Sequence, residues 1–250
     1  GSTDNSLEIL QQYSDKITII SQENHGLAFA LNIGIKQMKG DWFKWFSPDD
    51  VMYSYAIKTL VDEAKNNPNT IFYSNWEIIN ENGKKLREFQ ESNYNDLSNF
   101  EYNIRLLDGQ LINVNTALIP SSLFEINSIL DLADHVAIDY DFFLSSALLH
   151  DTKFYLISKP LIKYRIHSNQ LSHKNILKTM DYISKIKNEI LIQLDDSMSI
   201  KYINELKKYQ KTKSIKQKTL KFGMKILSSM PFWISNRILI FYLNNIRQNR

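Results

Sequence analysis

The sequence predicts an α/β domain with a largely parallel sheet, followed by a helical extension. Over about the first 170 residues, short apolar runs with strand character alternate with segments of helical period, the order that βα units produce. Hydrophobic residues make up 43% of the 250 residues and charged residues 23%, which excludes a disordered or fibrous chain. No run of 18 apolar residues occurs, so the sequence predicts no membrane-spanning helix. The absence of cysteine excludes disulfides, thiolate catalysis and Cys-ligated metal sites.

Four segments of this domain carry apolar side chains at helical spacing. The segment 27–39 ends at Gly40, and 55–66 is followed by Pro68; Gly and Pro are typical just beyond the end of a helix. A capping-box pattern at 122–125 marks the start of a further helix. We expect helices at 7–13, 27–39, 55–66 and 140–150.

Runs of β-branched and aromatic residues predict the strands between these helices. An Asn82-Gly83 pair supplies a turn signal after the run at 71–79, and Pro160 separates the last two runs. Segment 84–108 is polar and receives no assignment. We expect strands at 17–20, 42–46, 71–79, 110–119, 153–157 and 161–166.

The distribution of charge divides the chain into two regions. Residues 201–250 hold 12 Lys or Arg and one acid, whereas the first 200 residues hold 18 bases and 26 acids. Helical period continues over 176–194 and from 201 to about 225. We therefore expect an α/β domain at 1–172 and a basic helical extension at 173–250.

Asp49 and Asp50 follow directly after the aromatic strand predicted at 42–46. In α/β sheets, ligands bind outside the carboxyl ends of the strands. Adjacent carboxylates at such an edge suit a hard divalent cation that also holds a phosphate. The alternative is that the two residues only form a turn or cap the next helix.

Asp139 and His167 are two further candidates. Asp139 opens the helix predicted at 140–150, where a carboxylate caps the helix or serves as a general base. His167 follows the last strand, where it is a surface residue or a metal ligand. The residues alone leave these alternatives open. The sequence contains no H-E-x-x-H, G-x-S-x-G, P-loop or G-x-G-x-x-G motif.

Five motifs, taken in order along the chain, resemble those of the family 2 glycosyltransferases. These are bacterial enzymes with the GT-A fold, a Rossmann-like nucleotide-diphospho-sugar transferase domain, and they build surface polysaccharides such as capsule or O-antigen. The resemblance covers about residues 1–172. The motifs are Gly-Ser-Thr-Asp-Asn-Ser at 1–6, Asn-His-Gly-Leu at 24–27 with its helix to 34, Gly-Asp-Trp at 40–42, Ser-Pro-Asp-Asp at 47–50, and Asp-Tyr-Asp at 139–141 with Tyr-Arg-Ile-His at 164–167.

The resemblance implies an inverting, metal-dependent transfer of a sugar from a nucleotide-diphosphate sugar to a hydroxyl acceptor. Asp49 stands where the second acid of the family's D-x-D motif stands, which implies binding of Mg²⁺ or Mn²⁺ together with the donor diphosphate. Asp50 shares in metal or ribose binding, and His167 matches a histidine that adds a metal ligand. Asp139 matches the general base.

Three more residues are implied to line the nucleotide. They lie on the loop and helix of the second motif and are Asn24, Gly26 and Asn32.

Three departures from the family pattern accompany these matches. Ser47 replaces the first acid of D-x-D, and Ile138 replaces the glutamate that usually precedes the base. Family members also begin with a β-α-β segment of roughly 40 residues that binds the base of the nucleotide, and this chain starts after it. We therefore expect an N-terminally truncated GT-A domain whose isolated form is weak or inactive.

The resemblance also implies the binding partners and the cellular location. A UDP-sugar is the expected donor, and a saccharide or lipid-linked saccharide is the expected acceptor. The basic region 201–250 predicts a peripheral contact with an anionic membrane, and the implied location is the cytoplasm or the cytoplasmic face of the inner membrane. No nucleic-acid partner is expected, because the lysines join no RNA- or DNA-binding signature.

Two other functions compete with the transferase. One is a degenerate, non-catalytic glycosyltransferase-like binding or assembly protein. Ser47, Ile138 and the expected lack of the N-terminal β-α-β segment favour this function. The other is a nucleotidyltransferase, which would more typically carry a Gly-rich phosphate loop near its start.

Overall fold

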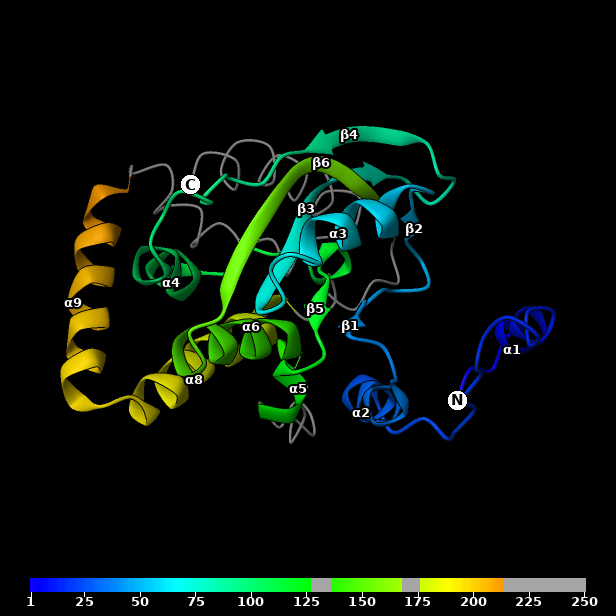
Figure 1. Cartoon of the computed structure of the whole chain (residues 1–250), viewed down its shortest axis with the longest axis horizontal. Coiled ribbons are helices and arrows are strands. Elements are labelled where there is room, and N and C mark those ends of the chain that lie inside the picture. The colour runs from blue at the N-terminus through cyan, green and yellow to red at the C-terminus, as the bar shows by residue number, and fades with distance from the viewer. Residues whose placement is uncertain (127–135, 168–175, 214–250) are drawn as a thin grey trace.

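A computed structural model describes residues 1–126, 136–167 and 176–213. Figure 1 shows a central sheet with helices on both faces. The elements are α1 (Ser6–Gln11), α2 (Leu27–Gln37), β1 (Trp42–Phe43), β2 (Val51–Met52), α3 (Ala56–Ala64), β3 (Thr70–Ile79), β4 (Lys85–Phe89), α4 (Asn99–Asp108), the 3₁₀ turn η1 (Val114–Thr116), β5 (Ile119–Pro120), α5 (Leu123–Ile126), α6 (Ile138–Leu149), β6 (Lys153–Arg165), α8 (Ile176–Gln193) and α9 (Asp196–Thr212).

The main sheet has the strand order β2-β6-β3-β4. β3 and β6 run parallel, whereas β2 pairs with β6 and β4 pairs with β3 in the antiparallel sense. The expectation of a largely parallel sheet is therefore wrong for the described residues: the sheet is mixed around one parallel pair. The antiparallel β4 follows β3 through the turn at Asn82-Gly83, since a short turn can join only antiparallel neighbours.

β3 is the centre of the molecule, and nine of its ten residues are buried. On one side Ile71 and Tyr73 pack with α4, α6 and α8. On the other, Phe72 packs with Ala56, Leu60 and Ala64 of α3. Those three α3 residues are four apart and share one helix face. Apolar residues at 71–73, 76 and 78–79 supply both covered faces, which is why the sequence predicted β3 well. Ser74, Asn75 and Glu77 are polar residues buried among them.

The helices after residue 175 pack on the α/β domain. Ile186 and Ile190 of α8 and Tyr202 of α9 join the largest apolar cluster, and Figure 1 shows α9 on the outer side of α4. The predicted boundary at residue 172 falls among residues 168–175, outside the described part, and stays a prediction. Residues 214–225 of the predicted basic helix also lie outside it. Among the described residues, no helix is both long and apolar enough to cross a membrane.

Several predicted elements are confirmed and others are wrong. The helices expected at 7–13, 27–39, 55–66, 140–150 and 176–194 correspond to α1, α2, α3, α6 and α8. The strand expected at 17–20 is absent, and the one at 42–46 shortens to the two residues of β1. The two strands expected at 153–157 and 161–166 are one strand, β6, because its register shifts around Pro160 and accommodates the missing N–H there.

Segment 110–119 is not the strand that its apolar residues predict. Asn113 turns the chain: its side chain accepts a hydrogen bond from the Asn115 N–H, and its carbonyl accepts one from the Thr116 hydroxyl. Segment 84–108, left unassigned, contains β4 and α4. The missed signal for α4 is a capping box, in which Ser98 and Glu101 bond each other's backbone N–H.

Candidate active site

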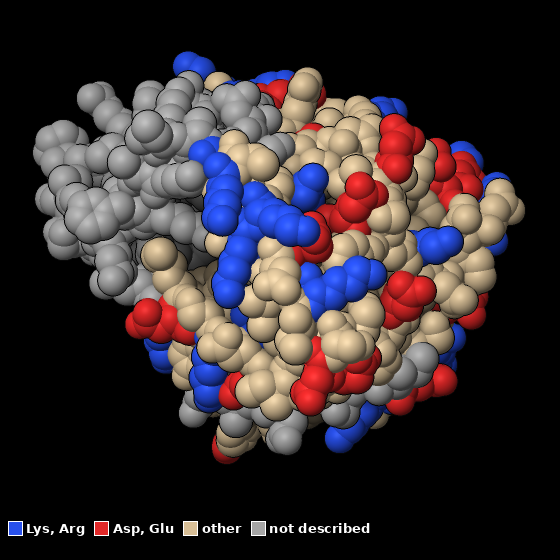
Figure 2. Space-filling view, turned by 90° about the vertical axis from the view of Figure 1, so that its left-hand side faces the viewer, with Lys and Arg blue, Asp and Glu red and all other residues tan. Residues whose placement is uncertain are grey.

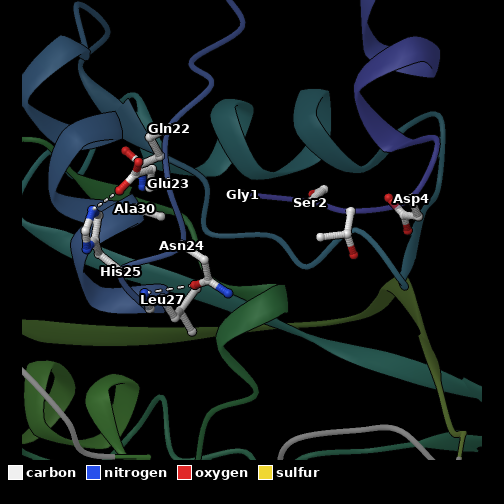
Figure 3. Close-up of a pocket in the computed structure, with 11 residues that line it drawn as sticks. Gly1, Ser2, Asp4, Gln22, Glu23, Asn24, His25, Leu27 and Ala30 are labelled. Atoms are coloured by element: carbon white, nitrogen blue, oxygen red, sulfur yellow. Dashed lines mark hydrogen bonds and ion pairs between the residues drawn. The ribbon is translucent and has the colours of Figure 1, made fainter.

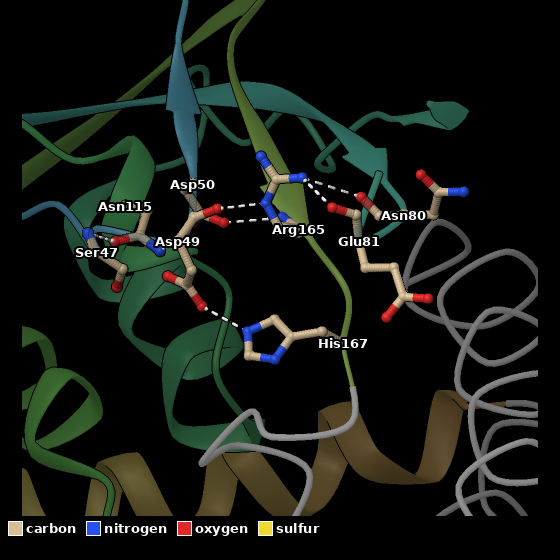
Figure 4. A network of polar contacts seen from close by, with 8 residues as sticks. All are labelled: Ser47, Asp49, Asp50, Asn80, Glu81, Asn115, Arg165 and His167. Atoms are coloured by element: carbon tan, nitrogen blue, oxygen red, sulfur yellow. Dashed lines mark hydrogen bonds and ion pairs between the residues drawn. The ribbon is translucent and has the colours of Figure 1, made fainter. Parts of the chain in front are cut away.

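Asp49 and His167 meet at one edge of the sheet. Asp49 lies in the turn before β2, and His167 lies two residues after β6. Pairing of β2 with β6 brings the two ends together, and Asp49 Oδ2 lies 3.0 Å from His167 Nε2. The Asp49 side chain is 37% exposed and that of His167 25%, so both are open to a ligand. Figure 4 shows the carboxylate directed at the ring.

Asp50 points the other way and is buried. Its Oδ2 accepts a hydrogen bond from the Asn115 amide at 2.6 Å, and its Oδ1 accepts one from the Arg165 backbone N–H at 2.8 Å. Burial raises the pKa of Asp50 to about 7, although these two hydrogen bonds oppose the change. The contacts of Asp50 are those of a residue that holds the turn together, so that Asp49 beside it is presented outward.

Arg165, the last residue of β6, joins the turn that carries Asp49 to the loop between β3 and β4. Its Nε donates to the Asp49 carbonyl at 2.7 Å, and its Nη1 donates to the carbonyls of Asn80 and Glu81 at 3.2 and 2.8 Å. Figure 4 shows this side chain between the two loops. Sequence reasoning missed Arg165, although it lies inside the Tyr-Arg-Ile-His motif.

Lys44 is linked to this site through Asn115, the residue that also donates to Asp50. Its Nζ donates to the carbonyls of Asn115 and Trp45, while the Asn115 side chain accepts from the Ser47 N–H at 2.9 Å. Burial lowers the pKa of Lys44 to about 7, and the nearby Asp50 carboxylate opposes the change. A neutral amine has two N–H donors, which matches the two carbonyls that it meets.

Asp139 lies in the first turn of α6 and is half-buried. Its Oδ2 accepts a hydrogen bond of 2.8 Å from Nε2 of Gln110, a residue 29 positions earlier in the chain. The N-cap residue of this helix, Ala137, has no side chain that could cap it. Gln110 is a second residue that sequence reasoning missed; its only signal is its place directly after Gly109, where α4 ends.

The first and second sequence motifs lie against each other. A Cβ atom on Gly1 would lie 2.7–2.8 Å from the Asn24 backbone and Cβ, so the two segments are in close contact. Between them is an open cavity of about 480 Å³, shown in Figure 3. Its lining residues are Gly1, Ser2, Thr3, Asp4, Gln22, Glu23, Asn24, His25, Gly26, Leu27 and Ala30.

The backbone conformation at position 26 requires glycine. Its φ of +88° with ψ of 171° belongs to a region that only glycine occupies readily. The Asn24 side chain accepts a hydrogen bond from the Gly26 N–H at 3.1 Å, and α2 starts at the next residue. Asn24 and Gly26 therefore both line the cavity, whereas Asn32, farther along α2, is not among its lining residues.

Comparison with known proteins identifies the family. Residues 1–119 match the family model described as glycosyl transferase family 2. The chain belongs to glycosyltransferase family 2. Curated relatives are uncharacterised glycosyltransferases of Rickettsia felis, 32% identical over 209 residues, and of Rickettsia prowazekii, 30% identical over 206 residues. Each alignment covers 79% of this chain, but the chain spans only 34% of the first relative and 64% of the second.

Solved structures confirm the GT-A-like fold of this family 2 member. Staphylococcus aureus TarS, residues 1–349, in complex with UDP-GlcNAc, matches with a TM-score of 0.56 and 15% identity. The match covers 82% of this chain and 60% of that one. A cholesterol galactosyltransferase of Borreliella burgdorferi is 33% identical over a shorter stretch of 96 residues, which covers 36% of this chain and 27% of that protein.

The residues at the sheet edge fit a divalent cation that takes part of its coordination from a ligand. Within the described ranges, no group of three or more His, Asp or Glu side chains converges on one point. Mg²⁺ is commonly held by one or two carboxylates together with substrate phosphates and water. The partly exposed Asp49 and His167 fit that kind of site, whereas a closed cage built from protein side chains alone does not.

Proposed function

We propose that this protein is an inverting glycosyltransferase that moves a sugar from a nucleotide-diphosphate sugar to a hydroxyl acceptor. The observation that carries the proposal is the pair formed by Asp49 and His167, which are 118 positions apart and 3.0 Å from each other. The buried Asp50 and the Arg165 side chain hold this pair in place. Asp139, held by Gln110, supplies the second carboxylate that such a reaction needs.

In this proposal Asp139 is the general base. The acceptor hydroxyl gives its proton to the Asp139 carboxylate while its oxygen attacks the anomeric carbon. The bond from that carbon to the nucleoside diphosphate breaks on the opposite face, which inverts the configuration. Asp49 and His167 would hold Mg²⁺ or Mn²⁺, which when bound neutralises the negative charge of the diphosphate. Asp50 contributes by orienting Asp49.

We assign a UDP-sugar as the donor class. Support comes from TarS, whose fold this chain shares and whose structure was solved with UDP-GlcNAc, and from the polar cavity beside Asn24 and Gly26. The proposed acceptor is a saccharide or lipid-linked saccharide in bacterial surface polysaccharide synthesis. Asn32 stays in the proposal as a residue of the nucleotide side.

We also propose that the protein works at the cytoplasmic face of a membrane. Figure 2 shows lysine and arginine side chains gathered, with some acids among them, on the face that α9 presents. Four exposed lysines of α9 contribute: Lys201, Lys207, Lys208 and Lys211. Cations near an anionic leaflet each add about 1 kcal/mol of binding.

Sedimentation with lipid vesicles tests the membrane contact. Binding should need anionic lipid and should weaken when Lys207, Lys208 and Lys211 are changed to Glu. Equal binding by that variant would contradict the membrane role.

The transferase proposal is tested with a panel of nucleotide sugars. The protein, expressed from its whole coding sequence, is assayed for donor binding, donor hydrolysis and transfer, with Mn²⁺ and with EDTA. Asp49→Ala should abolish metal-dependent donor binding. Asp139→Asn should keep binding and lose turnover by about 10²–10⁴-fold, the usual contribution of a general base.

Asp62→Asn is the matched control, because Asp62 lies exposed on α3 and its hydrogen bonds are with Lys58 of that helix and with Lys65 at its C-cap. It should behave like the wild type. If no donor binds with or without metal, the transferase proposal fails and a non-catalytic binding or assembly protein replaces it. Turnover that survives Asp139→Asn would show that another group is the base.

A further inference from the structure

The start of α6, which carries Asp139, is tied to the end of α4 by two side chains. The Tyr140 hydroxyl donates to the Leu106 carbonyl at 2.9 Å, and the Gln110 amide donates to Asp139 at 2.8 Å. Tyr140 is buried, so the first contact anchors the helix. The second contact reaches the carboxylate itself.

The backbone at Gln110 has little freedom. Asp108 is buried on one side of it, and Leu111 and Ile112 are buried on the other. In the described part of the chain, Oε1 of Gln110 is buried without a hydrogen-bond partner. The contact with Asp139 therefore decides which way the amide faces. An ionised carboxylate attracts the NH₂ side of an amide and repels its oxygen.

The same segment is held from the outside by α9. Asp108, the last residue of α4, is only 2% exposed. It accepts a hydrogen bond of 3.2 Å from Gln210 and forms an ion pair with Lys213, whose side chain is 10% exposed. One turn earlier, the Arg105 guanidinium lies 3.9 Å from the centroid of the Tyr209 ring. Residues at the end of α9 thus contact Asp108 of α4, which lies two residues before Gln110.

We propose that Gln110 is a positioning residue for the base Asp139, and that α9 fixes Gln110 through the buried pair of Asp108 and Lys213. The proposal rests on the proposed function, since it takes Asp139 as the base. It assigns the C-terminal helix a role in the reaction in addition to any contact with a membrane.

The physical reason lies in the two states of a carboxylate. An amide N–H donor favours the ionised form, which is the form that accepts a proton. The hydrogen bond to Oδ2 also restricts the orientation of the carboxylate relative to α6. A base that is misplaced by about 1 Å loses roughly 10²-fold in rate, so a residue that never touches the substrate can control turnover.

The first experiment compares Gln110→Ala and Gln110→Glu with the wild type in pH profiles of kcat. Gln110→Ala should lower kcat about 10–100-fold, leave the donor KM unchanged, and move the acidic limb of the profile to higher pH. Gln110→Glu keeps the size of the side chain but brings in a like charge, so it should move the limb further. Gln193→Glu, on the exposed face of α8, is the control and should leave the profile unchanged.

The second experiment tests the link to α9. Lys213→Met should move the acidic limb in the same direction as Gln110→Ala, but less far. In the Gln110→Ala background it should produce no additional movement, because the group through which it acts is gone. Lys185→Met removes an exposed lysine of α8 and controls for loss of charge.

A purely structural role predicts a different outcome. In that case the Gln110 and Lys213 variants lose thermal stability while the shape of the pH profile stays that of the wild type, and this result would overturn the proposal. Carbon-13 titration of the Asp139 carboxyl group gives a readout without turnover. If the wild type transfers no sugar, the proposed function fails; if the Asp139 titration is the same in Gln110→Ala, the positioning role fails independently.

Discussion

The first 40 residues and strand β3 differ sharply in how their apolar side chains are placed. Neither α1 nor α2 contains a buried residue, and Figure 1 shows α1 at one end of the molecule, apart from the sheet. β3, in contrast, is buried along nearly its whole length. The candidate site is divided in the same way: Asn24 and Gly26 lie in the weakly packed region, and Asp49, Asp139 and His167 lie on elements attached to the sheet.

This contrast indicates that substitutions near the sheet and substitutions in the first 40 residues should differ in their effects on stability and on donor binding. Changes near the sheet should reduce both stability and activity, because packing there positions the carboxylates. Changes in the first 40 residues should alter donor binding with little effect on the free energy of unfolding, since little apolar surface is buried there.

Phe72→Ala should have the largest effect on stability. Phe72 is 2% exposed in β3 and packs against α3. Removing a buried Phe side chain costs about 3–5 kcal/mol. Urea unfolding followed by circular dichroism should show this loss as a lower midpoint, and a loss below about 1 kcal/mol would contradict the central position of β3.

Lys44→Met should change how stability depends on pH. Because burial lowers the pKa of Lys44 to about 7, the unfolded chain holds a proton between about pH 7 and 10 that the folded chain lacks. The free energy of unfolding should therefore rise with pH in this range, by an amount on the order of 4 kcal/mol over three pH units at about 1.4 kcal/mol per unit. Lys44→Met should lose this rise.

Chemical unfolding at several pH values measures the effect. Lys58→Met is the control, since Lys58 is 80% exposed, and it should keep the wild-type slope. The same slope in Lys44→Met as in the wild type would show that Lys44 stays protonated in the folded state.

Gly26→Ala should weaken donor binding more than it weakens the fold. The backbone at Gly26 has a φ of +88°, and a side chain there costs about 1–3 kcal/mol. Because α2 buries no residue, we expect the loop to relax locally, so the affinity for the donor falls while Tm changes little. Gly34→Ala is the control, because a Cβ there meets no atom within 4 Å and Ala favours a helix. Calorimetric titration with the nucleotide sugar measures both variants, and equal affinities would place the donor away from this loop.

Phe29→Ala should have the smallest effect and completes the comparison with Phe72. Phe29 is 44% exposed on α2, and its ring contact is with His25 at 4.8 Å. We expect a loss within about 0.5 kcal/mol, as for most surface substitutions. A loss as large as that of Phe72→Ala would mean that α2 is buried in the working protein.

The elements that the sequence predicted correctly are those in which buried apolar residues recur regularly along the chain. β3 has buried apolar residues along most of its length, and α3 has Ala56, Leu60 and Ala64 at helical spacing. The strand expected at 17–20 has β-branched residues, but it pairs with no strand in the described part of the chain, and strand propensity alone does not supply a partner. Segment 110–119 failed because a side chain bonded the backbone locally and produced a turn.

The site was predictable only where a motif carried it. Asp49, Asp139 and His167 follow from the family resemblance, and the structure brings the first and last of them together. Gln110, Arg165 and Lys44 act through partners 29 to 116 positions away. Nothing in local periodicity indicates such contacts, because they depend on how strands and helices are arranged in space.

The separation of Asp49 from His167 also has a consequence for synthesis on the ribosome. The two residues are 118 positions apart, and at about 5–20 residues per second roughly 6–24 seconds pass between their translation. During that interval β2 and β3 have no β6 to pair with, and their apolar residues are open to chaperones. The candidate site can therefore assemble only after β6 has left the exit tunnel. A ribosome that stalls before then yields a nascent chain that contains Asp49 and Asp50 but cannot form the site.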